Sequence, residues 1–385
     1  MGRYIFEEEH EMFRDSVRSF LKNEIQPHGE RWREAGIVDR EAYLKAGEQG
    51  LLCMWAAEEY GGAGISDFRY EQILMEENFK NGDSGFFLWL HSRLVAPYLE
   101  SFGTEEQKQR WLPKCVSGEN ILAIAMTEPG AGSDVSGIRS RAEDKGDHYL
   151  LNGSKTFISN GILADLVVVA ARTEKDNPYG LSLLVVERGM EGFERGDNLK
   201  KMGLKSQDTA ELFFSNVKVP KENVLGEAGR GFYHLMHGLV EERLLAAVGF
   251  VANAEAAYDV TLDYIGERKA FGEPIGNFQN TRFKMASMRT ELEAANAFVD
   301  QCVMLHNDGK LSAEDAAKAK LFTSEVEGRV TDECVQLHGG NGYMEEYAVC
   351  RMYQDARVSR IYAGTSEIMR EIIARSIGLD PRKKN

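Results

Sequence analysis

The chain has 385 residues, of which 43% are hydrophobic and 28% are charged, so it is long enough for two or three globular domains with buried cores. Its 61 acidic residues outnumber its 46 basic residues, and the resulting formal charge of −15 argues against nucleic acid and anionic membranes as partners. Five scattered cysteines show no metal-binding spacing, no apolar run is long enough to cross a bilayer, and the first residues already follow an amphipathic pattern, so we expect no signal peptide. We therefore expect reduced thiols, no metal and no membrane insertion.

The pattern of residues 1–119 predicts an N-terminal all-α domain. Apolar residues recur at steps of three and four, which is typical of amphipathic helices. Thr104 and Gln107 form a capping box, which marks the start of a helix that ends at Gly118. The other predicted helices cover residues 6–21, 40–49, 68–79 and 84–102.

Residues 120–227 predict a middle domain made of β-strands. Short apolar runs, such as LVVVAA at 166–171 and LSLLVV at 181–186, are separated by Gly, Asp and Asn. No helical pattern alternates with these runs, so a parallel dinucleotide-binding sheet is not expected. We predict a small antiparallel β-barrel, with a sandwich as the alternative.

Residues 228–385 return to helical periodicity and predict a C-terminal four-helix bundle. Long helices joined by short turns, such as FGEPIG at 271–276, form antiparallel bundles. The fold class is therefore α+β and multidomain. The predicted helices cover residues 229–266, 277–307, 312–338, 345–357 and 366–377.

Two motifs give the chain a family resemblance. Residues 126–134 are MTEPGAGSD and residues 361–367 are IYAGTSE. With the order of helical domain, β domain and bundle, they resemble the acyl-CoA dehydrogenase family over essentially the whole chain. The resemblance implies an FAD enzyme that converts an acyl-CoA thioester to a trans-2-enoyl-CoA in β-oxidation or related catabolism, with an electron-transfer flavoprotein as acceptor. It also implies a homotetramer, a dimer of dimers, in a bacterial cytoplasm or a mitochondrial matrix.

The glycines of the first motif let the backbone approach a ligand, and its exposed N–H and hydroxyl groups can meet an anion. By the resemblance, this motif and the FIS segment contact the flavin through Met126, Thr127, Gly132, Ser133, Phe157, Ile158 and Ser159. A further set matches groups that reach the FAD of a neighbouring subunit, namely Arg268, Phe271, Gln279, Gln336, Gly339 and Gly340. Thr365 and Glu367 match a helix N-terminus that contacts the dinucleotide.

The second motif departs from the family at Ala363, where most members carry a catalytic glutamate. The resemblance implies that a backbone N–H of this loop donates to the enolate oxygen, and that donor is kept at Ala363 because it does not depend on the side chain. In VEERLLAA at 240–247, Glu241 and Glu242 both lie among apolar residues near Gly238, and spacing alone does not separate them. The resemblance favours Glu242, because long-chain and isovaleryl-CoA dehydrogenases carry their base directly before this arginine. Burial would raise the pKa of such a base.

The resemblance also implies contacts to the acyl-CoA from Ser133, Tyr179, Tyr233, Arg243, Ala363 and Gly364, of which Tyr179 lies in a variable loop. Two other functions stay open. One is an acyl-CoA oxidase that uses oxygen, and the other is a non-catalytic acyl-CoA-binding protein that lost its base. Local similarity is greatest to long-chain enzymes, while the length and branching of the acyl chain stay open.

Overall fold

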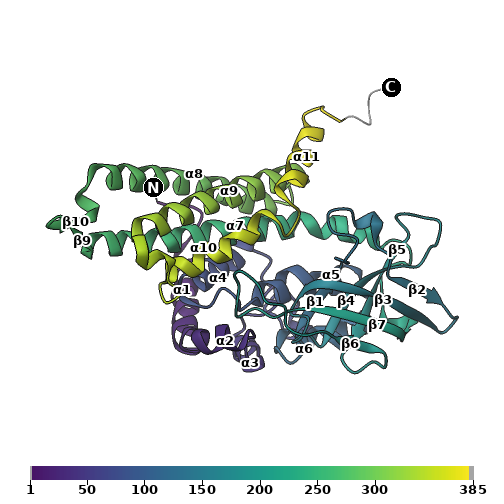
Figure 1. The fold of residues 1–385 in the computed structure, drawn as a ribbon. Coiled ribbons are helices and arrows are strands. Elements are labelled where there is room, and N and C mark those ends of the chain that lie inside the picture. Colours follow the sequence, from purple (N-terminus) through teal and green to yellow (C-terminus); the bar gives the residue numbers. More distant parts are fainter. Residues whose placement is uncertain (1, 381–385) are drawn as a thin grey trace.

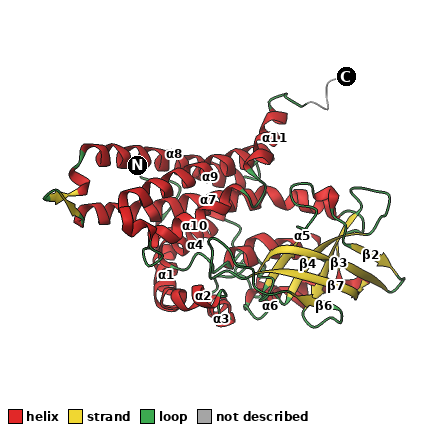
Figure 2. Cartoon of the chain, in the orientation of Figure 1, coloured by secondary structure: helices red, strands yellow, loops and turns green. Residues whose placement is uncertain are grey.

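The computed structural model describes residues 2–380, which form a helical part, a β part and a second helical part in chain order (Figure 1). The sheet lies at one end of the molecule, and the long helices of the C-terminal part extend away from it (Figure 2). The described residues contain no helix long and apolar enough to cross a membrane.

The N-terminal part is helical, as predicted. The predicted capping box is present in both directions, because Thr104 accepts from Gln107 N–H and Gln107 accepts from Thr104 N–H. The predicted helix at 84–102 is interrupted by a π-helical turn, Leu90–Val95, which the apolar pattern did not show. The helices are α1 (Glu8–Phe20), α2 (Gly29–Ala35), α3 (Arg40–Glu48), α4 (Phe68–Asn81), α5 (Ala96–Phe102) and α6 (Glu105–Val116).

The middle part is a sheet with the order β6-β7-β3-β2-β4-β5-β8, and β1 pairs with β4. Most neighbours are antiparallel, but β4 pairs in parallel with β1 and β2. Among the described residues no pairing joins β6 to β8, so the sheet is open and the predicted closed barrel is not seen. The end strands have only three and two residues, which leaves few backbone groups for closure. The strands are β1 (Leu122–Ala125), β2 (Arg141–Asp144), β3 (His148–Ser159), β4 (Leu166–Arg172), β5 (Leu181–Glu187), β6 (Phe193–Arg195), β7 (Thr209–Pro220) and β8 (Val224–Leu225).

The C-terminal part is built around one long helix, α7 (Gly231–Glu267), which contacts α4, α8, α9 and α10. Every residue from 242 to 254 is buried, because this stretch is apolar on nearly all sides and neighbours surround it. The remaining elements are the hairpin of β9 (Lys269–Ala270) and β10 (Glu273–Pro274), then α8 (Gln279–Asn307), α9 (Ala313–His338), α10 (Ala348–Ala356) and α11 (Ser366–Ser376).

Candidate active site

The loop between β1 and β2 carries the first motif and is fixed by a buried ion pair. Lys155 on β3 donates from Nζ to the Met126 carbonyl at 3.0 Å and to Glu128 Oε1 at 2.8 Å. Glu128 also accepts from the backbone N–H groups of Arg139 and Ser140. Burial lowers the pKa of Lys155 to about 8, although Glu128 acts in the opposite direction. The pair therefore ties the motif to β3 and to the segment that follows it.

The residues of this loop that are predicted to contact the flavin remain accessible to solvent. Gly132 and Ser133 are exposed, and Met126 and Thr127 are half-buried. A methyl group added at Gly132 would meet no atom within 4 Å, so a ligand can approach the backbone there. The Thr127 carbonyl accepts from the Thr156 N–H at 2.9 Å, which brings the loop beside the FIS segment.

Strand β3 turns Phe157 outward through a β-bulge. The register between β3 and β7 shifts between Lys155 and Ile158, and Phe157 has a φ of 59°. The Phe157 side chain is 68% exposed, whereas Ile158 is buried in the sheet and Ser159 is half-buried. Phe157 can therefore contact a planar ring, while Ile158 can meet a ligand only through its backbone.

The second set of predicted flavin residues lies at the opposite end of the bundle (Figure 1). The Tyr264 hydroxyl donates to the His338 carbonyl at 3.2 Å, which joins the ends of α7 and α9. Beside this junction the β9–β10 hairpin presents Phe271, whose side chain is 99% exposed. Within one chain, the residues of this second set lie together, but they lie far from the loop that carries the first motif. Its members, all exposed, are Arg268, Phe271, Gln279, Gln336, Gly339 and Gly340.

The loop before α11 contains Ala363 and is held by a buried lysine. Ala363 and Gly364 have φ values of 53° and 95°, in the left-handed region. Lys320 on α9 has no exposed surface and donates from Nζ to the Gly364 carbonyl at 2.6 Å. The Ala363 N–H has no acceptor in the described part of the chain, so it can donate to a ligand. Thr365 caps α11 and Glu367 is exposed in its first turn.

Glu242 lies in the buried stretch of α7 and is 5% exposed. The Tyr98 hydroxyl donates to Glu242 Oε1 at 3.0 Å. Burial raises the pKa of Glu242 to about 7, against the lowering effects of the Tyr98 hydrogen bond and the Arg243 charge. A carboxyl with this pKa can accept a proton from a carbon acid more readily than an exposed glutamate.

Glu241 has a different environment. Its carboxylate pairs with Arg93 Nε at 2.8 Å and with His306 Nε2 at 2.8 Å. It is also more accessible, with 26% of its side chain exposed. The sequence pattern did not distinguish Glu241 from Glu242 as the candidate base. In the structure they differ, because Glu241 pairs with two basic side chains whereas Glu242 accepts a hydrogen bond from one hydroxyl.

The predicted acyl-CoA contacts gather partly at the start of α7. The rings of Tyr179 and Phe232 lie 4.8 Å apart, and those of Phe232 and Tyr233 lie 5.9 Å apart. The Arg230 guanidinium lies 4.4 Å from the centre of the Tyr233 ring. Arg243 lies further along the helix, where it is buried and its Nε has no acceptor among the described residues.

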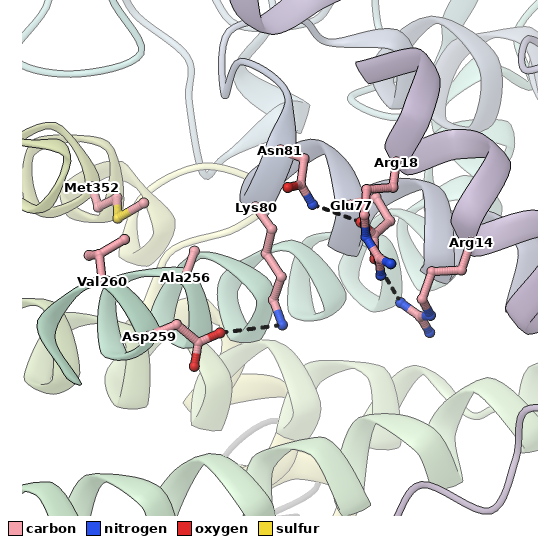
Figure 3. A pocket seen from close by; sticks show the side chains of 9 residues that line it. All are labelled: Arg14, Arg18, Glu77, Lys80, Asn81, Ala256, Asp259, Val260 and Met352. Atoms are coloured by element: carbon pink, nitrogen blue, oxygen red, sulfur yellow. Dashed lines mark hydrogen bonds and ion pairs between the residues drawn. The ribbon is translucent and has the colours of Figure 1, made fainter. Parts of the chain in front are cut away.

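A pocket of about 400 Å³ lies elsewhere, between α1, α4, α7 and α10 (Figure 3). Its charged side chains are engaged in ion pairs, because Glu77 accepts from Arg18 Nε at 3.0 Å and Lys80 lies 3.9 Å from Asp259. None of the predicted site residues lines this pocket, so it is separate from the candidate site. It is lined by Arg14, Arg18, Glu77, Lys80, Asn81, Ala256, Asp259, Val260 and Met352.

Comparison with known proteins shows which family the chain belongs to. Domain models described as the N-terminal, middle and C-terminal domains of acyl-CoA dehydrogenase match residues 7–119, 123–217 and 229–378. The mitochondrial long-chain specific acyl-CoA dehydrogenase of Mus musculus is 47% identical over 98% of this chain and 88% of its own length. The chain belongs to the acyl-CoA dehydrogenase family. A crystal structure of an acyl-CoA dehydrogenase from Geobacillus kaustophilus is 50% identical with a TM-score of 0.96, over 98% of this chain and all of its own.

Acyl-CoA dehydrogenases are FAD-dependent flavoproteins. A glutaryl-CoA dehydrogenase from Mycobacterium smegmatis, 29% identical with a TM-score of 0.91 over 97% of this chain and 96% of its own, was solved with FADH2. The residues present here fit this cofactor. Phe157 and Phe271 are uncovered apolar rings, and methyl groups added at Gly132, Gly339 or Gly340 would meet no atom within 4 Å. Flat apolar faces and open backbone are what a flavin dinucleotide needs for ring contact and phosphate approach.

The sequence pattern did not indicate three residues that contact the candidate site of this acyl-CoA dehydrogenase. They are Lys155, Lys320 and Tyr98, whose buried polar atoms contact the first motif, the Ala363 loop and Glu242. A lysine inside an apolar strand or helix is a signal that could have marked the first two, because a buried charge needs a partner. Tyr98 carried no such signal, because tyrosine is common in apolar helix faces.

Proposed function

We propose that Glu242 is the base that removes the α-proton of the acyl-CoA thioester. The observation that carries this proposal is the burial of its carboxyl in α7 with a pKa of about 7, while Glu241 is paired with Arg93 and His306. The α-hydrogen of a thioester is a weak acid, so a base with a raised pKa is better matched to it than an ordinary carboxylate.

The enolate oxygen that forms needs donors, and the Ala363 N–H is available for this purpose. Lys320 holds the adjoining Gly364 carbonyl, which keeps that N–H in a fixed direction. The chemistry that bound FAD supplies is acceptance of the β-hydrogen as hydride. The product is a trans-2-enoyl-CoA, and Glu242 retains the α-proton until it is released to solvent.

We also propose an electron-transfer flavoprotein as the acceptor and a homotetramer as the assembly, with fatty acid β-oxidation as the process. The family membership supports the acceptor and the process. Support for the assembly comes from the second flavin set, which lies exposed at the far end of the bundle and is therefore available to another subunit.

The test is single-turnover bleaching of the flavin by saturated acyl-CoAs from butyryl-CoA to stearoyl-CoA, with isovaleryl-CoA included. Glu242→Gln keeps the shape and removes the basicity, so flavin reduction should slow by at least about 10²-fold while FAD and acyl-CoA still bind. Glu241→Gln is the matched control, one residue away, and should lose much less. A Glu242→Gln enzyme that is reduced at the wild-type rate would show that the base is another residue.

A further inference from the structure

The Tyr98 hydroxyl approaches the proposed base from outside its own helix. Tyr98 lies on α5, is 2% exposed and donates to Glu242 Oε1 at 3.0 Å. Burial and the charge of Glu242 raise the pKa of Tyr98 well above its usual value, so the hydroxyl keeps its proton at neutral pH. The bond engages one carboxylate oxygen, and a carboxylate has further lone pairs with which it can accept a proton.

Local geometry sets the place of this hydroxyl. The π-helical turn Leu90–Val95 directly precedes α5, and Pro97 near the start of α5 has no N–H for a helical hydrogen bond. The wider turn changes the helical register, and in the structure Tyr98 faces α7. Gly238 lies one turn before Glu242 on α7, and a Cβ at Gly238 would lie 2.3 Å from the Tyr98 hydroxyl oxygen. The glycine therefore makes the close approach possible.

We propose that Tyr98 is a positioning residue for the reaction, which orients the Glu242 carboxylate and favours its ionised form in an apolar setting, and that Gly238 provides the space for its hydroxyl. This inference rests on the proposed role of Glu242 as the base. The reason is that a buried carboxylate without a donor loses its hydration and is left uncompensated, whereas one hydrogen bond both stabilises the charge and fixes the direction of the oxygens.

The other groups around the base do not take over this role. Arg243 and Glu241, its neighbours on α7, act on its carboxyl through their charges, in opposite directions. Arg93 from the π-helical turn and His306 from α8 pair with Glu241 instead. Among the described residues, Tyr98 is the one hydrogen-bond donor to the base.

The test uses the FAD-loaded enzyme and dodecanoyl-CoA, with flavin reduction followed in single turnovers as a function of pH. Tyr98→Phe keeps the ring and removes the donor, so the pKa of the base should rise. We expect the acid limb of the profile to move up by about one pH unit, which is about a tenfold slower reduction on that limb. Gly238→Ala displaces the hydroxyl and should move the limb in the same direction.

A second readout does not depend on turnover. In the oxidised enzyme without substrate, the infrared band of the protonated Glu242 carboxyl should disappear in Glu242→Gln. In Tyr98→Phe it should persist to higher pH than in the wild type. The matched control is Tyr60→Phe, because the Tyr60 hydroxyl also donates to a glutamate, Glu105 Oε1 at 2.6 Å, on the N-terminal helices. Its pH profile and its infrared band should be those of the wild type.

The outcomes separate the two claims. If Glu242→Gln slows reduction while Tyr98→Phe leaves both the acid limb and the infrared band where they are in the wild type, the role of Tyr98 is wrong and the base stands. If Glu242→Gln is reduced at the wild-type rate, the proposed function itself fails. If Gly238→Ala does not fold, the Tyr98→Phe profile still decides the inference.

Discussion

Adjacent glutamates on one helix differ here because successive residues point about 100° apart around the axis. Glu241 turns toward Arg93 and His306, whereas Glu242 turns toward Tyr98. All three partners lie more than sixty residues away in sequence. Local spacing therefore could not separate the two acids, and the family resemblance favoured one before the structure showed their different partners.

We predict that a catalytic base at position 363 can partly replace the proposed base Glu242. If both positions face the same carbon, Glu242→Gly combined with Ala363→Glu should recover part of the activity that Glu242→Gly loses. Ala363 already has a left-handed φ of 53°, so a glutamate there adds no new backbone strain, but the Tyr98 hydroxyl is placed to donate to Glu242 and recovery should therefore be incomplete. Single-turnover flavin reduction of the single and double variants measures this. No recovery, with FAD still bound, would mean that the two positions do not face the same carbon.

At the scale of elements, the sequence predicted individual helices and strands better than the closure of the sheet, since the apolar runs at 166–171 and 181–186 also match β4 and β5 within one residue. The long C-terminal helices were placed within two residues of α7, α8 and α9, because their apolar periodicity persists over many turns. The π-helical turn Leu90–Val95 was missed, since one inserted residue hardly changes an apolar pattern. Closure of the sheet was predicted and is not seen, because pairing between strands far apart in sequence leaves no local signal.

Glu71 on α4 is buried, which makes the stability of the protein depend on pH. Burial raises the pKa of Glu71 to about 7, and neither of its oxygens has a hydrogen-bond partner among the described residues. The folded state then holds this proton more tightly than the unfolded state. The free energy of unfolding therefore falls as pH rises from about 4.5 to about 7, by at most ~3 kcal/mol. It stays at this lower value above that range.

Glu71→Gln removes this titration, so the variant should gain stability over the wild type as pH rises. The measurement is the difference in melting temperature between variant and wild type at about pH 5 and about pH 8.5, because a pH-independent cost of the amide cancels in that comparison. Glu9→Gln, an exposed glutamate on α1, is the control and should show no such change. An equal difference at both pH values would mean that Glu71 is not protonated in the folded enzyme.

On the scale of the whole molecule, the two sets of residues that are predicted to contact the flavin lie at opposite ends of one chain (Figure 1). One set surrounds Phe157 on the sheet and the other surrounds Phe271 on the β9–β10 hairpin, and both rings are uncovered. We therefore expect that one dinucleotide does not meet both sets within a single subunit. A second copy that brings its hairpin to the sheet of the first would complete the site, which is why cofactor binding and assembly should depend on each other.

Arg268 offers a test of that dependence. Its exposed guanidinium makes no ion pair with the described residues, and an arginine fork suits a pyrophosphate. Arg268→Ala should weaken FAD binding by about tenfold or more, the effect of losing one charge-assisted hydrogen bond. It should also shift the sedimenting species from a tetramer toward smaller forms at low FAD. Arg141→Ala, which removes an exposed arginine from β2, should leave both unchanged. A wild-type protein that sediments as a flavin-loaded monomer would contradict the shared site, because the hairpin of another subunit would then not be needed to hold the cofactor.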